Sequence, residues 1–221
     1  MFFSVALFPL SNQLTRLGGA GLATGIWLGL LLLTWQHRRV RNFLVALTIS
    51  AALFLALPIQ RRSDVALLRQ DYVQSLQRYT GVPYCWGGES FKGIDCSGLI
   101  RRGLIDALFC RGLRPFEPQL IRYSIQLWWH DCTANDLGNA HPGRTDYLFD
   151  IPGINSVEES RLKLGDLAVT RNGSHILAYL GRSNWIEADP GEGRVVAVPA
   201  PSNNPWFNTP MKIMRWSVLQ Q

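Results

Sequence analysis

The first 60 residues of this 221-residue chain contain no acidic side chain, and the whole chain has only three lysines. Four of the 22 basic residues lie in that acid-free stretch, and the remaining basic residues exceed the 16 acidic ones by only two. A nucleic-acid-binding domain concentrates basic charge on the surface that meets the phosphates. The nearly neutral remainder of the chain therefore argues against a nucleic-acid partner.

Cysteine is also scarce, and the four cysteines form no Cys-x-x-Cys pair: Cys85, Cys96, Cys110 and Cys132. This spacing excludes a dense disulfide framework and the common zinc motifs, so neither a cofactor nor a metal is expected. By default Cys85, Cys110 and Cys132 are buried apolar residues. In an oxidising compartment Cys110 and Cys132 could pair.

Two uncharged stretches, at about 17–35 and 42–60, are each long enough to cross the hydrocarbon layer of a bilayer. The short polar link 36–41 joins them, so residues 1–62 are predicted to form a membrane anchor of two transmembrane helices. Neither stretch carries an ionisable residue, which argues against a pump or channel. A cleaved signal peptide fits poorly, because the first fifteen residues contain no basic side chain.

The orientation of this hairpin rests on a small charge difference. The compact arginine cluster in the link favours the link inside and the C-terminal domain outside the cell membrane. The opposite orientation would place residues 63–221 in the cytoplasm, and that alternative stays open.

Residues 63–221 have helical patterns first and strand patterns later. Ser63 is a candidate N-cap for a helix that runs to Tyr79, and a second helix is expected from Ser97 to Cys110. Five short β-type runs follow Leu164, separated by Gly, Asn and Pro: 167–171, 174–180, 185–189, 194–198 and 211–216. The order predicts an α+β domain with an antiparallel sheet, interrupted by an irregular insertion at about 111–160.

Cys96 stands at the first turn of the second expected helix, where unpaired backbone N–H groups and the helix dipole favour a thiolate. A nucleophilic thiol also needs a base, and the candidates are His130, His141 and His175. Only His175 opens an expected strand, where a rigid sheet can hold it against a helix start, so His175 is the predicted base.

Five separate motifs surround these residues in the chain: Pro83-Tyr84-Cys85-Trp86-Gly87-Gly88, Asp95-Cys96-Ser97-Gly98-Leu99, Leu164-Gly165-Asp166-Leu167, His175 to Gly181, and Trp185-Ile186-Glu187-Ala188. In this order the motifs resemble the NlpC/P60 family of papain-like cysteine peptidases, which cut bacterial cell-wall peptides. The resemblance covers roughly residues 64–200 apart from the insertion. It implies N-terminal helices packed on an antiparallel sheet.

The resemblance implies Cys96 as nucleophile, His175 as general base and Glu187 as the group that orients the imidazole. Tyr84 would lie beside the thiolate and bind or polarise the scissile carbonyl. Trp86, with its neighbouring glycines, would line the substrate cleft.

Ser97 is the further substrate-binding candidate, next to a helix start whose N–H groups would complete an oxyanion site. Glu187 departs from the family, which more often has His, Asn or Gln there, whereas the related CHAP domains commonly use an acidic residue. The carboxylate is expected to accept a hydrogen bond from His175 Nδ1–H. Asp189 is a lesser alternative in this role.

Strand geometry tests the assignment of Glu187, because side chains alternate between the faces of a sheet. A two-residue turn at 182–183 would pair Glu187 with Ala178, on the wrong face. A three-residue loop 181–183 pairs Glu187 with Leu177, on the face of His175. An odd-membered loop is therefore predicted, since an even and regular hairpin would remove Glu187 from the site.

Together these features predict a hydrolase that cleaves amide bonds in peptidoglycan stem or cross-link peptides, held at the bacterial inner membrane with its catalytic domain outside the cytoplasm. The expected partners are wall peptides, the lipid bilayer and an unidentified regulator. Two alternatives remain: an N-acetylmuramyl-L-alanine amidase or other thiol amidase or acyltransferase, and a non-catalytic module that binds wall peptides.

Several residues have simpler expected roles. Trp128 and Trp129 are expected to pack, although an aromatic pair in the insertion could also contact a ligand. Arg101 and Arg102 are expected on an exposed helix face, in solvent. Asp166 is explained by turn chemistry at a strand start.

Overall fold

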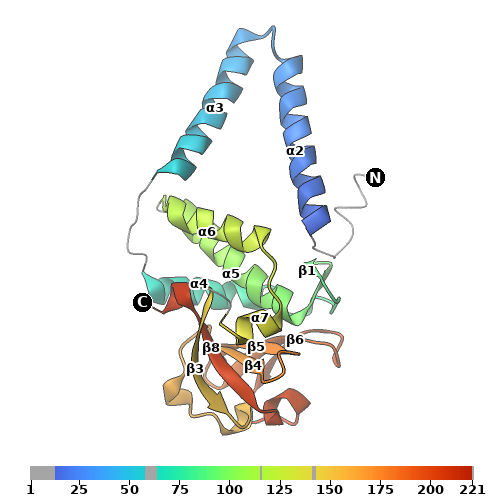
Figure 1. Ribbon diagram of the computed structural model, residues 1–221, viewed down its shortest axis with the longest axis vertical. Coiled ribbons are helices and arrows are strands. Elements are labelled where there is room, and N and C mark those ends of the chain that lie inside the picture. The colour runs from blue at the N-terminus through green and yellow to red at the C-terminus, as the bar shows by residue number, and fades with distance from the viewer. Residues whose placement is uncertain (1–12, 58–63, 115, 141–142, 221) are drawn as a thin grey trace.

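The computed structural model describes residues 13–57, 64–114, 116–140 and 143–220. Two long helices stand above a body of shorter helices and strands, with the sheet farthest from the long pair (Figure 1). The predicted α+β class with an antiparallel sheet is confirmed.

The long pair consists of α2 (Gln13–Leu33) and α3 (Arg38–Ala56), both long and apolar enough to cross a membrane. Arg16 is the one buried residue of these two helices, unlike the mostly buried core helix of a soluble protein. Both helices begin four residues before the uncharged stretches, because arginine and glutamine are good helix formers and do not end a helix. Residues 58–60 of the second stretch lie outside the described residues.

α3 is fastened to the body through α6 (Pro118–Trp129). Arg122 Nη1 donates hydrogen bonds to the Leu55 and Leu57 carbonyl oxygens at 2.7 and 2.8 Å, where the last carbonyls of α3 lack partners within the helix. The rings of Phe54 and Phe116 also meet edge to face, with centroids 6.1 Å apart.

Two helices packed against each other form the core layer of the body. α4 (Val65–Gln77) is capped by Asp64, whose side chain accepts from the Ala66 and Leu67 backbone N–H groups, whereas the expected cap Ser63 lies outside the described residues. α5 (Cys96–Leu113) packs along it. A Cβ at Gly103 would lie 2.6 Å from the Leu76 side chain, so the glycine permits this close approach.

The main sheet has the strand order β3-β8-β4-β5-β6-β7, all antiparallel. Its strands are β3 (Thr145–Ile151), β4 (Leu167–Thr170), β5 (Ile176–Gly181), β6 (Asn184–Asp189), β7 (Arg194–Pro199) and β8 (Met211–Trp216). One face packs on α4 and α5, and the other face packs on Phe207 and the loops around it. A separate small ribbon, β1 (Glu89–Ser90) with β2 (Gly93–Ile94), lies before α5.

The expectation that residues 111–160 are irregular is wrong. This segment contains the end of α5, α6, α7 (Ala134–Gly138) and β3, the edge strand of the sheet. β3 escapes the sequence pattern because its pairing with β8 shifts between Tyr147 and Phe149, which breaks the alternation of buried and exposed residues.

Candidate active site

Cys96 is the first residue of α5, and Asp95 caps that helix. The Asp95 carboxylate accepts hydrogen bonds from the Gly98 backbone N–H at 2.6 Å and from the Gly87 backbone N–H at 2.7 Å. A Cβ at Gly98 would lie 2.3 Å from the Gly88 carbonyl oxygen, so only glycine fits where the loop crosses the helix. Asp95 therefore holds the 87–88 loop against the residue that carries the thiol.

The Cys96 thiol is buried, with 6% of the residue exposed. Burial, reinforced by the negative charge of Asp95, raises the pKa of Cys96 to about 12, while the backbone N–H groups of Ser97 and Ile176 favour the thiolate. The helix start alone therefore does not ionise this cysteine, and the thiol needs a base. Ile176, whose N–H lies beside the thiol, directly follows His175.

His175 is buried immediately before β5 and is held on two sides. Its Nε2 lies 2.5 Å from Glu187 Oε2, and its ring stacks on Trp206 with centroids 4.2 Å apart. Its backbone N–H donates to Thr170 Oγ1 at 3.0 Å. The expectation of an Nδ1 contact with Glu187 is wrong, because Glu187 approaches from the neighbouring strand and meets the far nitrogen of the ring. This arrangement leaves Nδ1 for another partner.

Glu187 reaches His175 through an irregular hairpin. The strands pair Ala178 with Ile186, the register that places Glu187 opposite Leu177 as predicted. The predicted three-residue loop is wrong, however: only Arg182 and Ser183 form the turn, both at positive φ. The register shifts between Tyr179 and Gly181, and this bulge supplies the odd residue that the loop was expected to supply.

The Glu187 carboxylate is fully buried among polar groups. Its second oxygen, Oε1, accepts from Asn204 Nδ2 at 2.9 Å, and the same Nδ2 lies 3.0 Å from Asp189 Oδ2. Burial raises the pKa of Glu187, and the hydrogen bond with His175 opposes that shift. Asp189 contacts Asn204 rather than His175, so Glu187 is the carboxylate that meets the imidazole.

A cavity of about 390 Å³ contains the Cys96 thiol. Trp86 and Ser97 line it, as do the glycines of the 87–88 loop. Tyr84 is half-buried beside the thiol, where burial and then the Cys96 charge raise the pKa of the phenol to about 12. The structure therefore brings all three substrate-binding candidates to the thiol.

The opposite wall of this cavity is charged, which the sequence did not indicate. Glu89, Arg101 and Asp131 line it. The expectation that Arg101 is in solvent is wrong: 2% of the residue is exposed, and its guanidinium pairs with both carboxylates. Arg102 is partly exposed and pairs with Asp106 one helical turn away.

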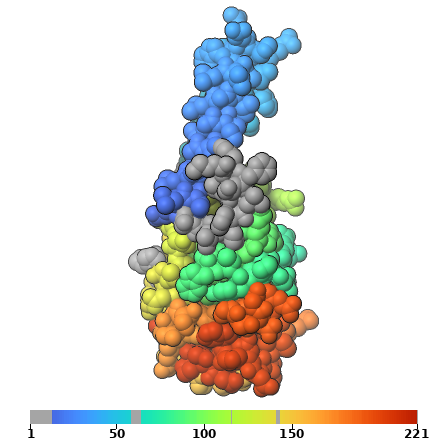
Figure 2. All heavy atoms as spheres, turned by 90° about the vertical axis from the view of Figure 1, so that its right-hand side faces the viewer, coloured from blue at the N-terminus to red at the C-terminus, as the bar shows by residue number. Residues whose placement is uncertain are grey.

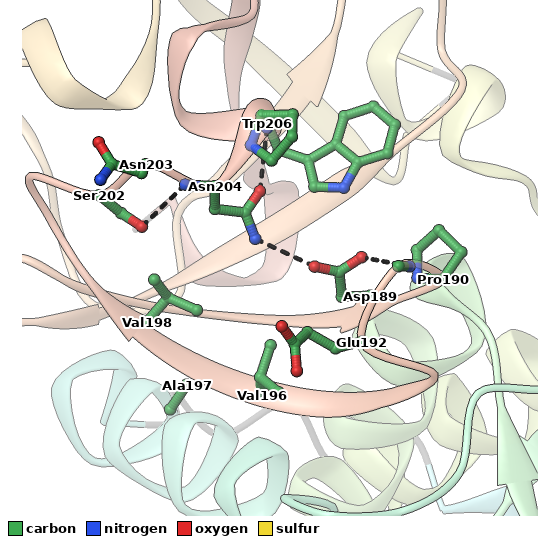
Figure 3. A pocket seen from close by; sticks show the side chains of 12 residues that line it. Asp189, Pro190, Glu192, Val196, Ala197, Val198, Ser202, Asn203, Asn204 and Trp206 are labelled. Atoms are coloured by element: carbon green, nitrogen blue, oxygen red, sulfur yellow. Dashed lines mark hydrogen bonds between the residues drawn. The ribbon is translucent and has the colours of Figure 1, made fainter.

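A second, larger pocket of about 700 Å³ lies on the other side of the His175–Glu187 pair. Figure 3 shows its rim, with the Asn204 amide and the Asp189 carboxylate directed toward each other and the Trp206 ring above them. Asn204 and Trp206 were missed by sequence reasoning, because their Pro- and Asn-rich loop has no periodic pattern. Glu192 and Asp189 give this pocket an acidic rim.

The other candidate side chains have structural surroundings. All four cysteines are free thiols. Of the three that were expected to be buried apolar residues, Cys132 is buried, Cys85 is half-buried and Cys110 is exposed. His130 ends α6 with its ring near the Gln126 carbonyl oxygen. His141 lies outside the described residues. Asp166 exceeds its expected turn role, since it is fully buried in a pair with Arg215 at 2.6 Å.

Comparison with known proteins points to bacterial wall enzymes. The chain is 26% identical over 122 residues to "Murein DD-endopeptidase MepS/Murein LD-carboxypeptidase" of Escherichia coli, a match that covers 54% of this chain. It spans about half the length of this curated relative, 48%. No protein-family model matches the chain.

Solved structures overlap the chain at lower similarity. The peptidoglycan hydrolase RipB from Mycobacterium tuberculosis has a TM-score of 0.44 at 22% identity and covers 70% of this chain and 67% of that one. The P60 domain of an antigen from M. avium subspecies paratuberculosis has a TM-score of 0.42 at 23% identity, with 70% and 96% covered. The first of these structures is described as a peptidoglycan hydrolase and the second as a P60 domain.

Proposed function

We propose that this chain is a thiol hydrolase of the NlpC/P60 type that cleaves amide bonds in peptidoglycan stem or cross-link peptides. The observation that carries the proposal is the buried 2.5 Å contact between His175 and Glu187, adjacent to the Cys96 thiol at the start of α5. A thiol whose pKa is raised by burial needs an oriented base, and His175 supplies one. The murein endopeptidase relative supports the substrate class.

The reaction is acyl transfer to sulfur. The Cys96 thiol gives its proton to His175 while Sγ attacks the amide carbonyl carbon, and Glu187 stabilises the imidazolium that forms. The tetrahedral intermediate collapses with cleavage of the C–N bond, and the imidazolium protonates the leaving amine. Water then attacks the thioester while His175 takes a proton from it, the C–S bond breaks, and the imidazolium returns the proton to Cys96 Sγ. The carboxylic acid product then leaves the site.

The negative oxygen of the intermediate needs hydrogen-bond donors. Backbone N–H groups at the start of α5 have no partners within the helix, and the Tyr84 phenol lies beside the thiol. Burial keeps Tyr84 protonated, so its O–H is available as a donor. We assign Tyr84 and the first N–H groups of α5 to this role.

We further propose that residues 1–62 anchor the enzyme in the bacterial inner membrane and that residues 63–221 are the catalytic domain outside the cytoplasm. The exposed apolar side chains of α2 and α3 support the anchor, because such a surface is unfavourable in water. A reporter fused after Gln221 tests the orientation: activity of a periplasm-specific reporter is expected, and activity of a cytoplasm-specific reporter would overturn the assignment.

The central experiment is mass spectrometry of purified muropeptides incubated with the full chain in detergent micelles. The wild type is expected to yield new fragments, Cys96→Ala none, and Cys110→Ala the wild-type pattern, because Cys110 is an exposed cysteine outside the cavity. Cleavage by Cys96→Ala would overturn the mechanism. Binding without cleavage by a folded wild-type chain would instead support a non-catalytic module.

Fragment masses also decide between the two enzymatic alternatives. Cleavage within the peptide supports an endopeptidase. Release of the intact peptide from its sugar supports an N-acetylmuramyl-L-alanine amidase, the alternative that the acidic residue at position 187 favours.

A further inference from the structure

Four charged side chains join the first apolar helix to the wall of the Cys96 cavity, and we call them the Arg16 cluster. Arg16 Nη2 lies 3.0 Å from Glu89 Oε2, and Arg101 Nη1 lies 3.0 Å from Glu89 Oε1. Asp131 pairs with both arginines, at 3.7 Å from Arg16 and closer to Arg101. Two positive and two negative charges balance, and three of the four side chains are buried, whereas that of Asp131 is 52% exposed.

Arg16 is part of α2, one of the two long apolar helices, but its side chain is buried against the body. It stands one residue before the uncharged stretch 17–35, yet its side chain is only 3% exposed. Its guanidinium donates to the Trp129 carbonyl oxygen at 3.4 Å and lies 6.0 Å from the Trp128 ring centroid. In Figure 2 the blue atoms of α2 reach down to the yellow surface of the body.

Glu89, the partner of Arg16, fixes the part of the chain that faces the thiol. Glu89 belongs to β1 and pairs with Ile94 of β2. The residue before it, Gly88, accepts a hydrogen bond at its carbonyl oxygen from the Asp95 backbone N–H at 3.1 Å. The segment 86–89 lines the cavity throughout. A displacement of Glu89 therefore moves the cavity wall relative to Cys96.

We propose that Arg16 is a positioning residue: through Glu89 it holds the 86–89 wall in the shape that accepts substrate, so that the first apolar helix is a working part of the site. The statement about substrate rests on the proposed function. Loss of the Arg16 charge would leave one positive and two negative charges beside the cavity. Wall movement and this excess negative charge both weaken the binding of a peptide that carries carboxylates.

The kinetic test uses the full chain in detergent micelles with muropeptides as substrate. Arg16→Gln is expected to raise KM about tenfold with kcat within about threefold of wild type, and Arg16→Lys to restore part of the loss. Arg41→Gln is the matched control, because Arg41 lies in α3, where its guanidinium donates to the Trp35 carbonyl oxygen and lies over the Trp35 ring, away from the cavity. Unchanged KM in Arg16→Gln would overturn the proposal.

Hydrogen exchange gives a readout that does not depend on activity. In Arg16→Gln the amides of residues 86–95 are expected to lose protection by about tenfold or more, while those of β4 to β8 keep theirs. Adding Glu89→Gln should cause little further loss if Arg16 acts through Glu89. A uniform loss across the body would assign Arg16 to global stability alone and overturn the positioning role. A wild-type chain that cleaves nothing would refute the proposed function, while the exchange data would still decide the positioning of the wall.

Discussion

Two polar networks flank the Cys96 thiol, and they are built in opposite ways. On the sheet side, His175, Glu187, Asp189 and Asn204 lie within residues 175–204, where Glu187 contacts the imidazole and Asn204 bridges Glu187 to Asp189. On the helix side, the Arg16 cluster gathers residues as far apart as Arg16 and Asp131 and pairs every charge. Burial is unfavourable for the two carboxylates of the sheet-side network, which contains the proposed catalytic groups. The Arg16 cluster has balanced charges, so its burial costs less free energy.

This difference has a physical origin. Burial raises the pKa of Glu187, so the ionised carboxylate that the proposed mechanism requires depends on hydrogen bonds from His175 and Asn204. The Arg16 cluster has no such constraint, and its net charge of zero reduces the cost of removing its members from water. We therefore expect substitutions on the helix side to change stability most and substitutions on the sheet side to change rate most.

The largest stability effect is expected from Arg101→Leu. Leucine keeps the helix propensity of arginine but leaves Glu89 and Asp131 without this partner, and breaking a buried pair costs about 3–5 kcal/mol. Arg102→Leu, at the next position in α5, removes a partly exposed pair with Asp106 and should cost less than about 1 kcal/mol. Urea unfolding of the full chain in micelles, followed by tryptophan fluorescence, measures both. Equal losses would contradict the comparison.

The largest rate effect on the sheet side is expected from Glu187→Gln. The amide keeps the size of the carboxylate but cannot stabilise the imidazolium, so kcat should fall on the order of 100- to 1,000-fold. Glu192→Gln, on the exposed rim of the second pocket, should leave kcat unchanged. Fragment release from muropeptides measures both variants, and a matching loss in Glu192→Gln would remove the special role of position 187.

The Glu187→Gln variant also tests how the stability of the fold depends on pH. Because the folded pKa of Glu187 is raised, its protonation favours the folded state at low pH, and this contribution is lost as pH rises through that pKa. Glutamine is neutral at every pH. The free energy of unfolding of Glu187→Gln, relative to that of wild type, should therefore be more favourable at pH 7 than at pH 4. Urea midpoints at the two pH values test the sign.

A smaller, pH-dependent effect is expected from Asn204→Leu. This change removes a hydrogen bond to the Glu187 carboxylate and so raises the pKa of Glu187 further. The acidic limb of the kcat/KM profile should move to higher pH, with a greater loss of activity at pH 5 than at pH 8. A profile lowered evenly at every pH would show that Asn204 does not act on this carboxylate.

The smallest effect is expected in the hairpin turn that sets the register of Glu187. Arg182 has a φ of 51°, a left-handed conformation that asparagine tolerates better, so Arg182→Asn should raise stability by roughly 0.5 kcal/mol. Ser183→Gly also suits the turn but removes the hydroxyl that donates to Glu159 Oε2 at 2.9 Å. Ser183→Gly should therefore raise the melting temperature less than Arg182→Asn does in thermal unfolding. A larger increase would contradict this account.

The sequence predicted the parts of the fold whose pattern is local. The five strands from β4 to β8 are short runs of β-type residues separated by Gly, Asn and Pro, and α4 and α5 follow helical spacing. β3 was missed because a register shift interrupts its alternation. The site divides in the same way: motifs and strand faces identify Cys96, His175 and Glu187, and the correct register was obtained from a wrong loop length.

Long-range pairings could not be predicted from the pattern. Arg16 and Glu89 lie 73 positions apart, and an arginine before an apolar stretch is typical of a membrane boundary rather than of a buried pair. Arg101 lies on α5 about one turn beyond Cys96. Helical spacing alone does not show which face of α5 is covered by residues 111–160. Asn204 and Trp206 come from a loop that only the tertiary structure brings to His175.

The docked position of Arg16 has a consequence for how the enzyme meets its substrate. With α2 in a bilayer, the residue next to the uncharged stretch is also a contact of the cavity wall, so the thiol lies near the level of the lipid headgroups. Catalysis then becomes a search in two dimensions, governed by lateral diffusion and by the number of enzymes per unit of membrane area. Under the proposed function, peptides presented close to the membrane come within reach, and amide bonds in distant layers of the wall do not.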